Sequence, residues 1–272
     1  MKEGVEPGSV FVLEGDVYHP TGRAVGPWTP DTIQGSASAG LLARALERVP
    51  QPTAMVLARL SFDLWRPVAR HSLTVAVSVL RDGRKARTVE ASLVQDAKPV
   101  ARCTALFLRA DPASAPPAGA PAASPPGPEA GRPIPERVRN WSPFFRGVDT
   151  RVIDGDLERP GPTAAWFSLV PPLVAGEANS SLVQTVSAAD LASGISAFVD
   201  RGAWSYVNAD LGVMMWRPPM GGWILVSAET KAGTQGTGLA MGLLSDVHGP
   251  FGSCAQNLIF ERARRRDPGS GR

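Results

Sequence analysis

Two stretches of the chain share one pattern: ARLSFDLWRP at residues 58–67 and ADLGVMMWRP at residues 209–218. A constant offset of 151 residues aligns the longer segments 58–109 and 209–260 without a gap. The residues that coincide under this offset are Leu60 with Leu211, Trp65-Arg66-Pro67 with Trp216-Arg217-Pro218, Val75 with Val226, Leu93 with Leu244, Pro99 with Pro250, and Cys103 with Cys254. A rare tripeptide, a proline and both cysteines in a single register predict an internal duplication.

A proline-rich segment separates the two copies. Residues 110–135 read ADPASAPPAGAPAASPPGPEAGRPIP, a composition that favours extended polyproline conformations and cannot form a core. The sequence therefore predicts an N-terminal unit over residues 1–109, a Pro/Ala-rich linker over 110–139, a C-terminal unit over 140–262 and a basic disordered tail over 263–272.

Each copy shows the same order of elements: a leading strand, one helix, and four strands joined by hairpins. In the first copy we expect a strand over 10–18, a helix over 34–48, and strands ending at Trp65 and then running through 73–79, 89–93 and 101–108. In the second copy we expect a strand over 164–169, a helix marked by Leu191, Ile195, Phe198 and Val199, and strands over 206–216, 223–230, 238–244 and 253–260. An antiparallel sheet in this order can wrap around its single helix.

The charge pattern argues against a nucleic-acid partner. The net charge is +3, but residues 261–272 contain five arginines against two acids, so the rest of the chain is neutral. A neutral body lacks the one-sided electrostatic field that binding to a phosphate backbone requires. With 272 residues, 43% of them hydrophobic, the chain can still bury a substantial core.

Other features bear on the compartment and on cofactors. The two cysteines are too few for a disulfide scaffold and have no metal-ligand spacing. The N-terminus has no apolar signal core, and no run of about 18 apolar residues occurs. We expect a cytoplasmic protein with no membrane span, no metal and no cofactor.

The usual catalytic signatures are missing. No GxSxG motif occurs, because the serines within 35–40 (GSASAG) do not have the required glycine spacing. His19, His71 and His248 lie in turn-like stretches and are not paired at helical spacing. Residues 233–238 (GTQGTG) open no helix, so a hairpin turn is expected there instead of a phosphate loop.

Three polar residues of the second copy remain as candidates. Asp190 stands at the start of the expected second helix, where free N–H groups favour an ionised carboxylate and where a simple capping acid is also common. Gln256 lies among apolar residues, where an unmet hydrogen bond costs roughly 1–3 kcal/mol, so it is either a functional amide or one bonded to backbone. Strict alternation turns Asn208 away from the face of Leu211 and Val213, unless a bulge reverses it.

The chain resembles the acyl-CoA thioesterase family with a double hotdog fold, over about residues 8–109 and 160–262. The resemblance rests on the duplicated order of elements, on the two strands that end in Trp-Arg-Pro, and on Ser253-Cys254-Ala255-Gln256 in the last strand. It implies an α+β fold in which two β-α-β4 units, each an antiparallel sheet around one helix, pair as a pseudo-dimer.

The resemblance also implies a site. In that family the second unit supplies an acid at the helix start, a threonine or similar polar residue on the following strand, and a glutamine on the last strand. These positions hold Asp190, Asn208 and Gln256, so Asn208 departs from the threonine form. The corresponding first-unit residues are Gln34, Leu57 and Ala105, which leaves one active site per chain.

The implied reaction is hydrolysis of an acyl-CoA or another acyl thioester, without a cofactor. Asp190 would act as general base on a water held by Asn208 and Gln256, while backbone N–H groups around Gln34 and Gly35 would bind the substrate's developing oxyanion. Two alternatives stay open: a hotdog protein that binds acyl thioesters without turnover, and a biosynthetic enzyme such as a dehydratase, although the Asp and His pair of dehydratases is missing. Assembly of double hotdogs into a homodimer is a further expectation.

Overall fold

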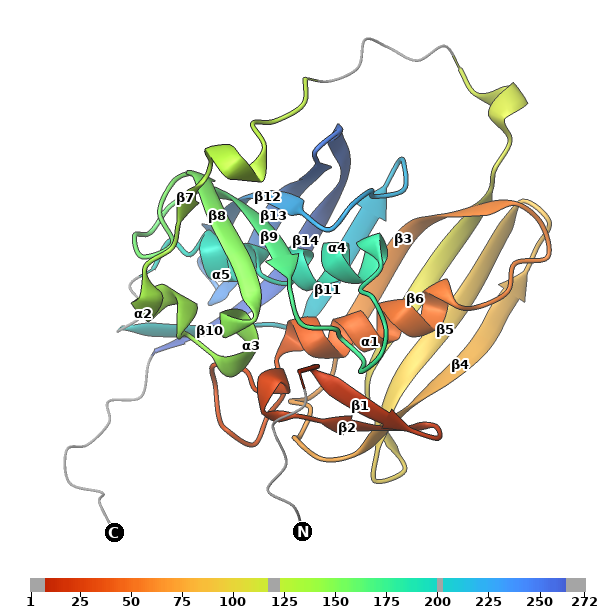
Figure 1. The fold of residues 1–272 in the computed structure, drawn as a ribbon, viewed down its shortest axis with the longest axis horizontal. Helices are drawn as coiled ribbons and strands as arrows, with labels where there is room; N and C mark the ends of the chain where they lie inside the picture. The colour runs from red at the N-terminus through yellow and green to blue at the C-terminus, as the bar shows by residue number, and fades with distance from the viewer. Residues whose placement is uncertain (1–7, 117–122, 200–202, 263–272) are drawn as a thin grey trace.

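The computed structural model describes residues 8–116, 123–199 and 203–262. The first half of the chain begins with a short hairpin and continues with one long helix and four long strands (Figure 1). These elements are β1 (Phe11–Glu14), β2 (Val17–Pro20), α1 (Gly35–Glu47), β3 (Met55–Leu64), β4 (Leu73–Asp82), β5 (Ala86–Gln95) and β6 (Lys98–Arg109), with the single-turn helix η1 (Gly22–Ala24) before α1.

The second half has the same plan with additional elements in front. It contains β7 (Arg132–Pro133), α2 (Glu136–Arg139), α3 (Pro143–Arg146), β8 (Val148–Asp154), β9 (Thr163–Leu169), α4 (Ser181–Ala189), α5 (Ala192–Ile195), β10 (Trp204–Asn208), β11 (Asp210–Met215), β12 (Ile224–Ala232), β13 (Thr237–Asp246) and β14 (Gly249–Arg262). The first residues of β4, β5 and β6 coincide with those of β12, β13 and β14 under the 151-residue offset.

A single sheet runs through both halves in the order β1-β2-β4-β5-β6-β3-β11-β14-β13-β12-β9-β8-β7, with β10 also paired to β14. The halves join where β3 pairs antiparallel with β11, for example at Phe62 and Leu211. Helices α1 and α4 contact each other and lie in front of this sheet in Figure 1. Each half therefore wraps its part of the sheet around a central helix, which is the arrangement that the sequence predicts.

The sequence of α1 explains its central place. It is rich in Ala and Leu, which favour helix, and ten of its residues are buried, so it is apolar on most sides. Gly40 permits the approach to the second half, because a Cβ there would lie 3.1 Å from Leu173 and 3.6 Å from the Ser187 hydroxyl. The expected helix over 34–48 is confirmed.

The expected second helix is placed wrongly by the sequence prediction. The main helix, α4, precedes Asp190, and its first turn is capped by Ser180, whose Oγ accepts a hydrogen bond from the N–H of Val183 at 3.1 Å. Asp190 is the C-terminal cap of α4, and only the four-residue α5 follows it. Leu191 and Ile195, on which the predicted helix was based, lie at the C-terminal end of the helical segment. The prediction did not use Ser180, the N-cap that marks the start of α4.

The leading strands also differ from expectation. The strand expected over 10–18 is a hairpin, β1 and β2, that turns at Gly15 with a φ of 64°. In the second half β9 confirms the expected strand, but it is preceded by β8, which pairs with it and was not predicted. A positive φ at a single glycine is enough to reverse the chain, so the alternating pattern on both sides resembled one long strand.

The end of the proline-rich segment packs on the second half. The Pro126 carbonyl accepts a hydrogen bond from Trp166 Nε1 at 2.9 Å, and Ile134 and Val138 are buried. Residues 132–139 form β7 and α2. The division into units and linker stays a prediction, and the tail over 263–272 lies outside the described residues.

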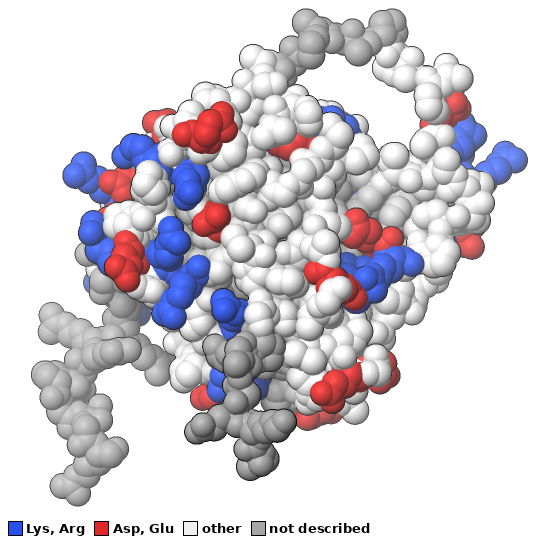
Figure 2. All heavy atoms as spheres, viewed as in Figure 1, with Lys and Arg blue, Asp and Glu red and all other residues white. Residues whose placement is uncertain are grey.

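The described surface shows both signs of charge. On the face seen in Figure 2, basic and acidic side chains are interspersed toward the edges, and most of the centre carries neither. Among the described residues no helix is both long enough and apolar enough to cross a membrane. Within the same ranges no cluster of three or more His, Cys, Asp or Glu could hold a metal ion.

Candidate functional site

A cavity of about 410 Å³ lies between the start of α1 and the segment α4–α5–β10 of the second half. Its lining is mostly apolar and aromatic: Pro27, Trp28, Gln34, Gly35, Trp141, Ser142, Phe145, Asp190, Leu191, Ser193, Gly194, Ile195, Trp204, Ser205, Tyr206 and Asn208. Four of the five residues predicted for the site line it, namely Asp190, Asn208, Gln34 and Gly35. Asp190 is its one ionisable acid, which makes this cavity the candidate active site.

The Asp190 carboxylate is held by neutral donors from three elements. Its Oδ2 accepts a hydrogen bond from Ser36 Oγ at 2.8 Å, and its Oδ1 accepts one from Asn208 Nδ2 at 3.0 Å. Gln256 Nε2 is 3.4 Å from Oδ1, and the Gln34 side chain and the Ser36 N–H are further donors. Only 8% of Asp190 is exposed, so these contacts replace most of its hydration.

Burial raises the pKa of Asp190 above its usual range, because an ionised carboxylate loses water there. Hydrogen bonds from Ser36, Asn208 and Gln34 act in the opposite direction and limit the rise. A carboxylate with a raised pKa is a stronger base than an exposed one, and a general base works best with a pKa near the operating pH.

The helix terminus that serves Asp190 belongs to the other half of the chain. Asp190 lies at the C-terminal end of α4, where the helix dipole disfavours a negative charge. The start of α1 faces it instead: Ser36 donates from the first turn, and a Cβ built on Gly35 would lie 2.9 Å from Asp190 Oδ2. The sequence predicted that Asp190 lies near the free N–H groups of a helix start. It does, but the helix is α1 of the first half.

Asn208 reaches the site because of a β-bulge. Asn208 pairs with Leu258 of β14, and Gly212 pairs with Ala255. The chain thus advances four residues from Asn208 to Gly212 while β14 advances three, which leaves one extra residue on this side. The extra residue separates β10 from β11 and reverses the face on which Asn208 lies relative to Leu211. The bulge required for an inward Asn208 is therefore present.

Gln256 supports the site from behind and does not line the cavity. It is fully buried, its Oε1 accepts from the Ser193 N–H at 2.9 Å, and its Nε2 donates to the Asp190 carbonyl at 3.1 Å. Its amide thus binds backbone on both sides of Leu191, as the structural alternative predicted, while keeping the longer contact with Oδ1. These bonds fix the junction of α4 and α5 on β14.

The predicted oxyanion donors differ in availability. The Gln34 N–H donates to the Ala24 carbonyl at 2.8 Å and is therefore not free to bind an oxyanion in this structure, while the Gln34 side chain donates to Asp190. Within the described part of the chain the Gly35 N–H has no acceptor. As the first residue of a 13-residue helix, it points a free donor and the positive end of the helix dipole at the cavity.

Among the described residues of the first half, two of the three positions that correspond to the site are apolar. Leu57 and Ala105, which correspond to Asn208 and Gln256, pack in or against the hydrophobic core. With apolar side chains at both positions, hydrogen-bond donors do not gather there as they do around Asp190. The contrast supports the prediction of one site per chain.

Sequence reasoning missed two parts of the site. Ser36, next to Gly35, donates to Asp190 at 2.8 Å, a shorter distance than that from Asn208 or Gln256, and only the pairing of the two halves brings it there. Trp141 and Phe145 form one wall, with rings stacked at 5.6 Å and an interplanar angle of 25°. Two aromatic residues four positions apart, just after a proline-rich stretch, were the available signal for that wall.

Several solved structures share the fold over nearly the whole chain. A proposed thioesterase II from Thermobifida fusca is 19% identical, with a TM-score of 0.70 over 95% of this chain and 98% of that one. An acyl-CoA thioesterase II from Mycobacterium marinum is 17% identical, with a TM-score of 0.62 over 94% and 96%. A hot dog protein of unknown function from Alicyclobacillus acidocaldarius is 13% identical, with a TM-score of 0.67 over 95% and 98%. These likenesses confirm the predicted hotdog fold.

Sequence comparison identifies the family. No curated protein matches the chain. The family of the acyl-CoA thioesterase N-terminal domain matches residues 24–108, and that of the acyl-CoA thioesterase C-terminal domain matches residues 117–260. Together these matches include every residue of the candidate site, and the chain therefore belongs to the acyl-CoA thioesterase family.

Proposed function

We propose that this protein hydrolyses acyl-CoA thioesters, with Asp190 as general base. The observation that carries the proposal is a buried carboxylate with a raised pKa, set in an apolar cavity and held by donors from both halves. Family membership supports the reaction class, and the apolar lining suits an uncharged acyl group.

In the proposed step, a water in the cavity attacks the thioester carbonyl carbon while Asp190 accepts one of its protons. The tetrahedral intermediate then collapses with cleavage of the C–S bond, and the proton on Asp190 passes to the departing sulfur. The products are a carboxylic acid and a free thiol. Because a thiolate is a good leaving group, no strong general acid is required.

Backbone and amide groups have separate proposed roles. The Gly35 N–H at the start of α1 stabilises the oxyanion that forms on the carbonyl oxygen. Asn208, which lines the cavity and bonds Asp190 Oδ1, orients the attacking water. Gln256 acts by fixing the backbone around Asp190.

The experiment is thiol release from a panel of acyl-CoAs, comparing the wild type with Asp190→Asn. A general base contributes typically 10²- to 10⁴-fold, so we expect kcat to fall by about 10³-fold. Asp210→Asn is the matched control, because Asp210 bonds Asn257 at an exposed position and should leave kcat unchanged. Unchanged turnover in Asp190→Asn would remove Asp190 from the mechanism.

One observation favours a protein that binds acyl thioesters without turnover. A carboxylate offers about four acceptor sites, and Asp190 already receives donors from Ser36, Asn208, Gln34 and Gln256. If the wild type binds a long-chain acyl-CoA tightly and releases no thiol, this alternative replaces the hydrolase. A dehydratase is less well supported, since none of His19, His71 and His248 lines the cavity.

A further inference from the structure

Ser36 connects the two halves of the chain at the proposed base. It lies in the first turn of α1, is fully buried, and donates its hydroxyl proton to Asp190 Oδ2 at 2.8 Å across 154 positions of sequence. Because the two residues belong to different halves of the chain, this hydrogen bond forms only when the halves pair.

A second serine on the same helix provides a comparison. Ser38, two residues further on, is also buried, at 1% exposure, but its hydroxyl has no hydrogen-bond partner within the described ranges. A buried serine on α1 thus does not automatically find an acceptor. The Ser36 hydroxyl instead meets an acceptor whose other oxygen is fixed independently by Asn208.

The surroundings of Asp190 make this bond important. The groups that face the carboxylate are Gln34 and Ser36 from the first half, Asn208 from β10, and Gln256 from β14, with the Cys254 thiol of β14 as the nearby titratable group. Among the described residues no Lys, Arg or His pairs with Asp190. The ionised form is therefore stabilised by neutral donors alone, and hydrogen bonds to a charged acceptor are stronger than neutral ones.

We propose that Ser36 is a positioning residue for the base: its hydroxyl, supplied by the first half, fixes Oδ2 and so holds the Asp190 carboxylate in one orientation at the substrate cavity. The inference rests on the proposed function. It also gives the first half, which has no site of its own, a direct part in the reaction. The protein then needs both halves for one base, in addition to the oxyanion donor at Gly35.

The test compares Ser36→Ala with Ser38→Ala in the full chain, using thiol release from acyl-CoA across a range of pH. Loss of a hydrogen bond to a charged group should lower kcat by about 10- to 100-fold in Ser36→Ala, with a smaller change in KM. Because the lost donor favours the ionised carboxylate, the acidic limb of the kcat profile should move to higher pH. Ser38→Ala should leave kcat and the profile unchanged.

Ser36→Cys keeps the size of the side chain and supplies a weaker donor, so it should be intermediate in both readouts and serves if Ser36→Ala fails to fold. A wild-type kcat and pH profile in either folded variant would overturn the proposal. If the wild type itself releases no thiol, the proposed function fails separately. An infrared titration of the Asp190 carboxyl, assigned by difference from Asp190→Asn, then decides: an unshifted titration in Ser36→Ala overturns the role of Ser36.

Discussion

Gly35 and Asp190, from opposite halves of the chain, lie so close that a Cβ on Gly35 would come within 2.9 Å of Asp190 Oδ2 and 3.3 Å of Oδ1. Real Cβ atoms essentially never lie that close to another atom, so the position excludes every residue larger than glycine unless the carboxylate moves. The glycine lets the start of α1 approach the buried acid, where Ser36 then reaches it.

This relationship predicts the effect of Gly35→Ala. Alanine is a better helix former than glycine, so α1 itself should not be weakened. The new methyl group displaces the carboxylate, and a misplacement of about 1 Å at a reacting group costs on the order of 10² in rate. We expect a loss of that size in kcat for thiol release with a thermal midpoint close to that of the wild type. Gly222→Ala is the control, because a Cβ there would meet only the Ser168 hydroxyl at 4.0 Å, an ordinary contact distance; equal kcat in both variants would contradict the argument.

A second prediction concerns stability and pH at Asp190. Since burial raises its folded pKa, the folded state retains a proton that the unfolded chain has released, and wild-type stability falls as pH rises through that pKa. Asp190→Asn has no such group. The free energy of unfolding of the variant should therefore increase relative to that of the wild type as the pH rises from about 4, the ordinary pKa of an aspartate, through the raised folded pKa. Urea unfolding at several pH values checks this, and a variant that loses stability relative to the wild type as the pH rises would contradict the argument.

The sequence predicted the fold better than it predicted the site. Alternating apolar residues located β5 and β6, because each of these strands buries one face and exposes the other. The same alternation located β4, although most of that strand, including Val77 and Val79, is exposed. The helix α1 was recognisable from its leucine spacing. The two errors concern local structure. The hairpin that turns at Gly15 was predicted as one strand, and the helix that begins after Ser180 was placed too far along the chain.

The site depends on contacts that a linear pattern does not contain. Asp190 was found through family resemblance, but its donors come from α1 and from a bulge that no residue type marks. Gln256 was correctly considered as a backbone-bonded amide, yet only the register of β14 shows which backbone it binds. Ser36 was not predicted, because the contact forms only when the two halves pair.

Both cysteines should be unreactive in the native protein. Burial raises the pKa of Cys254 to about 12 and that of Cys103 well above its usual range. The thiolate is the reactive form, so at about pH 8 neither side chain should react with a thiol reagent. Ellman's reagent should detect no thiol in the folded chain and two after denaturation. Rapid labelling of the folded protein would contradict this prediction, because it would show that at least one of the two cysteines becomes exposed to the reagent.

Trp141 should influence which acyl groups are accepted. Its ring stacks on Phe145 and forms a wall of the cavity. Removing it enlarges the cavity, and one methylene in an apolar pocket is worth about 10- to 200-fold in discrimination. We expect Trp141→Ala to shift kcat/KM toward bulkier acyl-CoAs, mainly through KM. Trp223→Ala, whose ring contacts Arg151 and does not line the cavity, should leave the preference unchanged. An identical shift in the two variants would refute a role for the wall.

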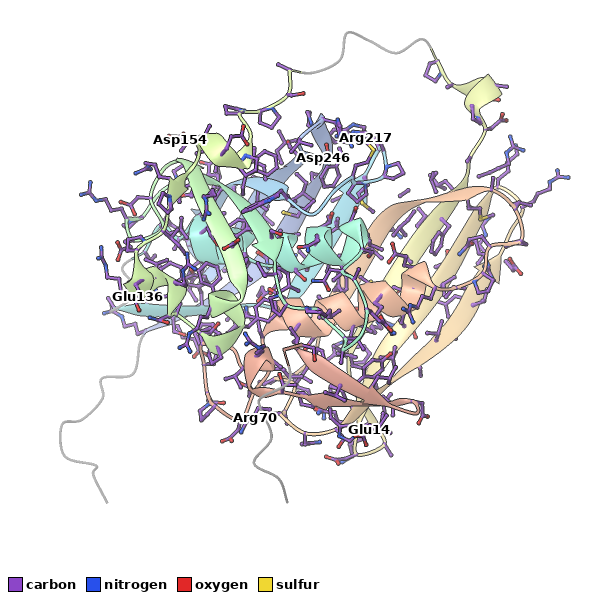
Figure 3. The ribbon with its side chains drawn as sticks, viewed as in Figure 1. Glu14, Arg70, Glu136, Asp154, Arg217 and Asp246 are labelled. Carbon is purple, nitrogen blue, oxygen red and sulfur yellow. The ribbon has the colours of Figure 1, made fainter. Side chains whose placement is uncertain are left out.

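The turn between β13 and β14 depends on a buried ion pair. Asp246 and Arg217 are neighbours at one end of the second half (Figure 3). The Asp246 side chain is inaccessible and accepts from Arg217 Nη1 at 2.6 Å and Nη2 at 2.8 Å, and also from the N–H groups of Met220 and His248. At the corresponding place in the first half, the Gln95 amide binds the backbone of Ala69 and His71. A charged pair and a neutral amide thus anchor equivalent turns.

Asp246→Asn should destabilise the fold by about 3 kcal/mol, because one partner of a buried pair is left uncompensated. The more exposed pair of Asp63 and Arg102 is the control, and Asp63→Asn should change stability by less than about 1 kcal/mol. Although burial alone would raise the pKa of Asp246, the bonds from Arg217 hold it below its usual range. Its contribution is therefore complete above about pH 4 and is lost as pH falls further. In urea unfolding at neutral pH, the free energy of unfolding of Asp246→Asn should be well below that of Asp63→Asn. In acid, the difference between Asp246→Asn and the wild type should become smaller. Equal free energies for the two variants at neutral pH would mean that the turn does not depend on the ion pair.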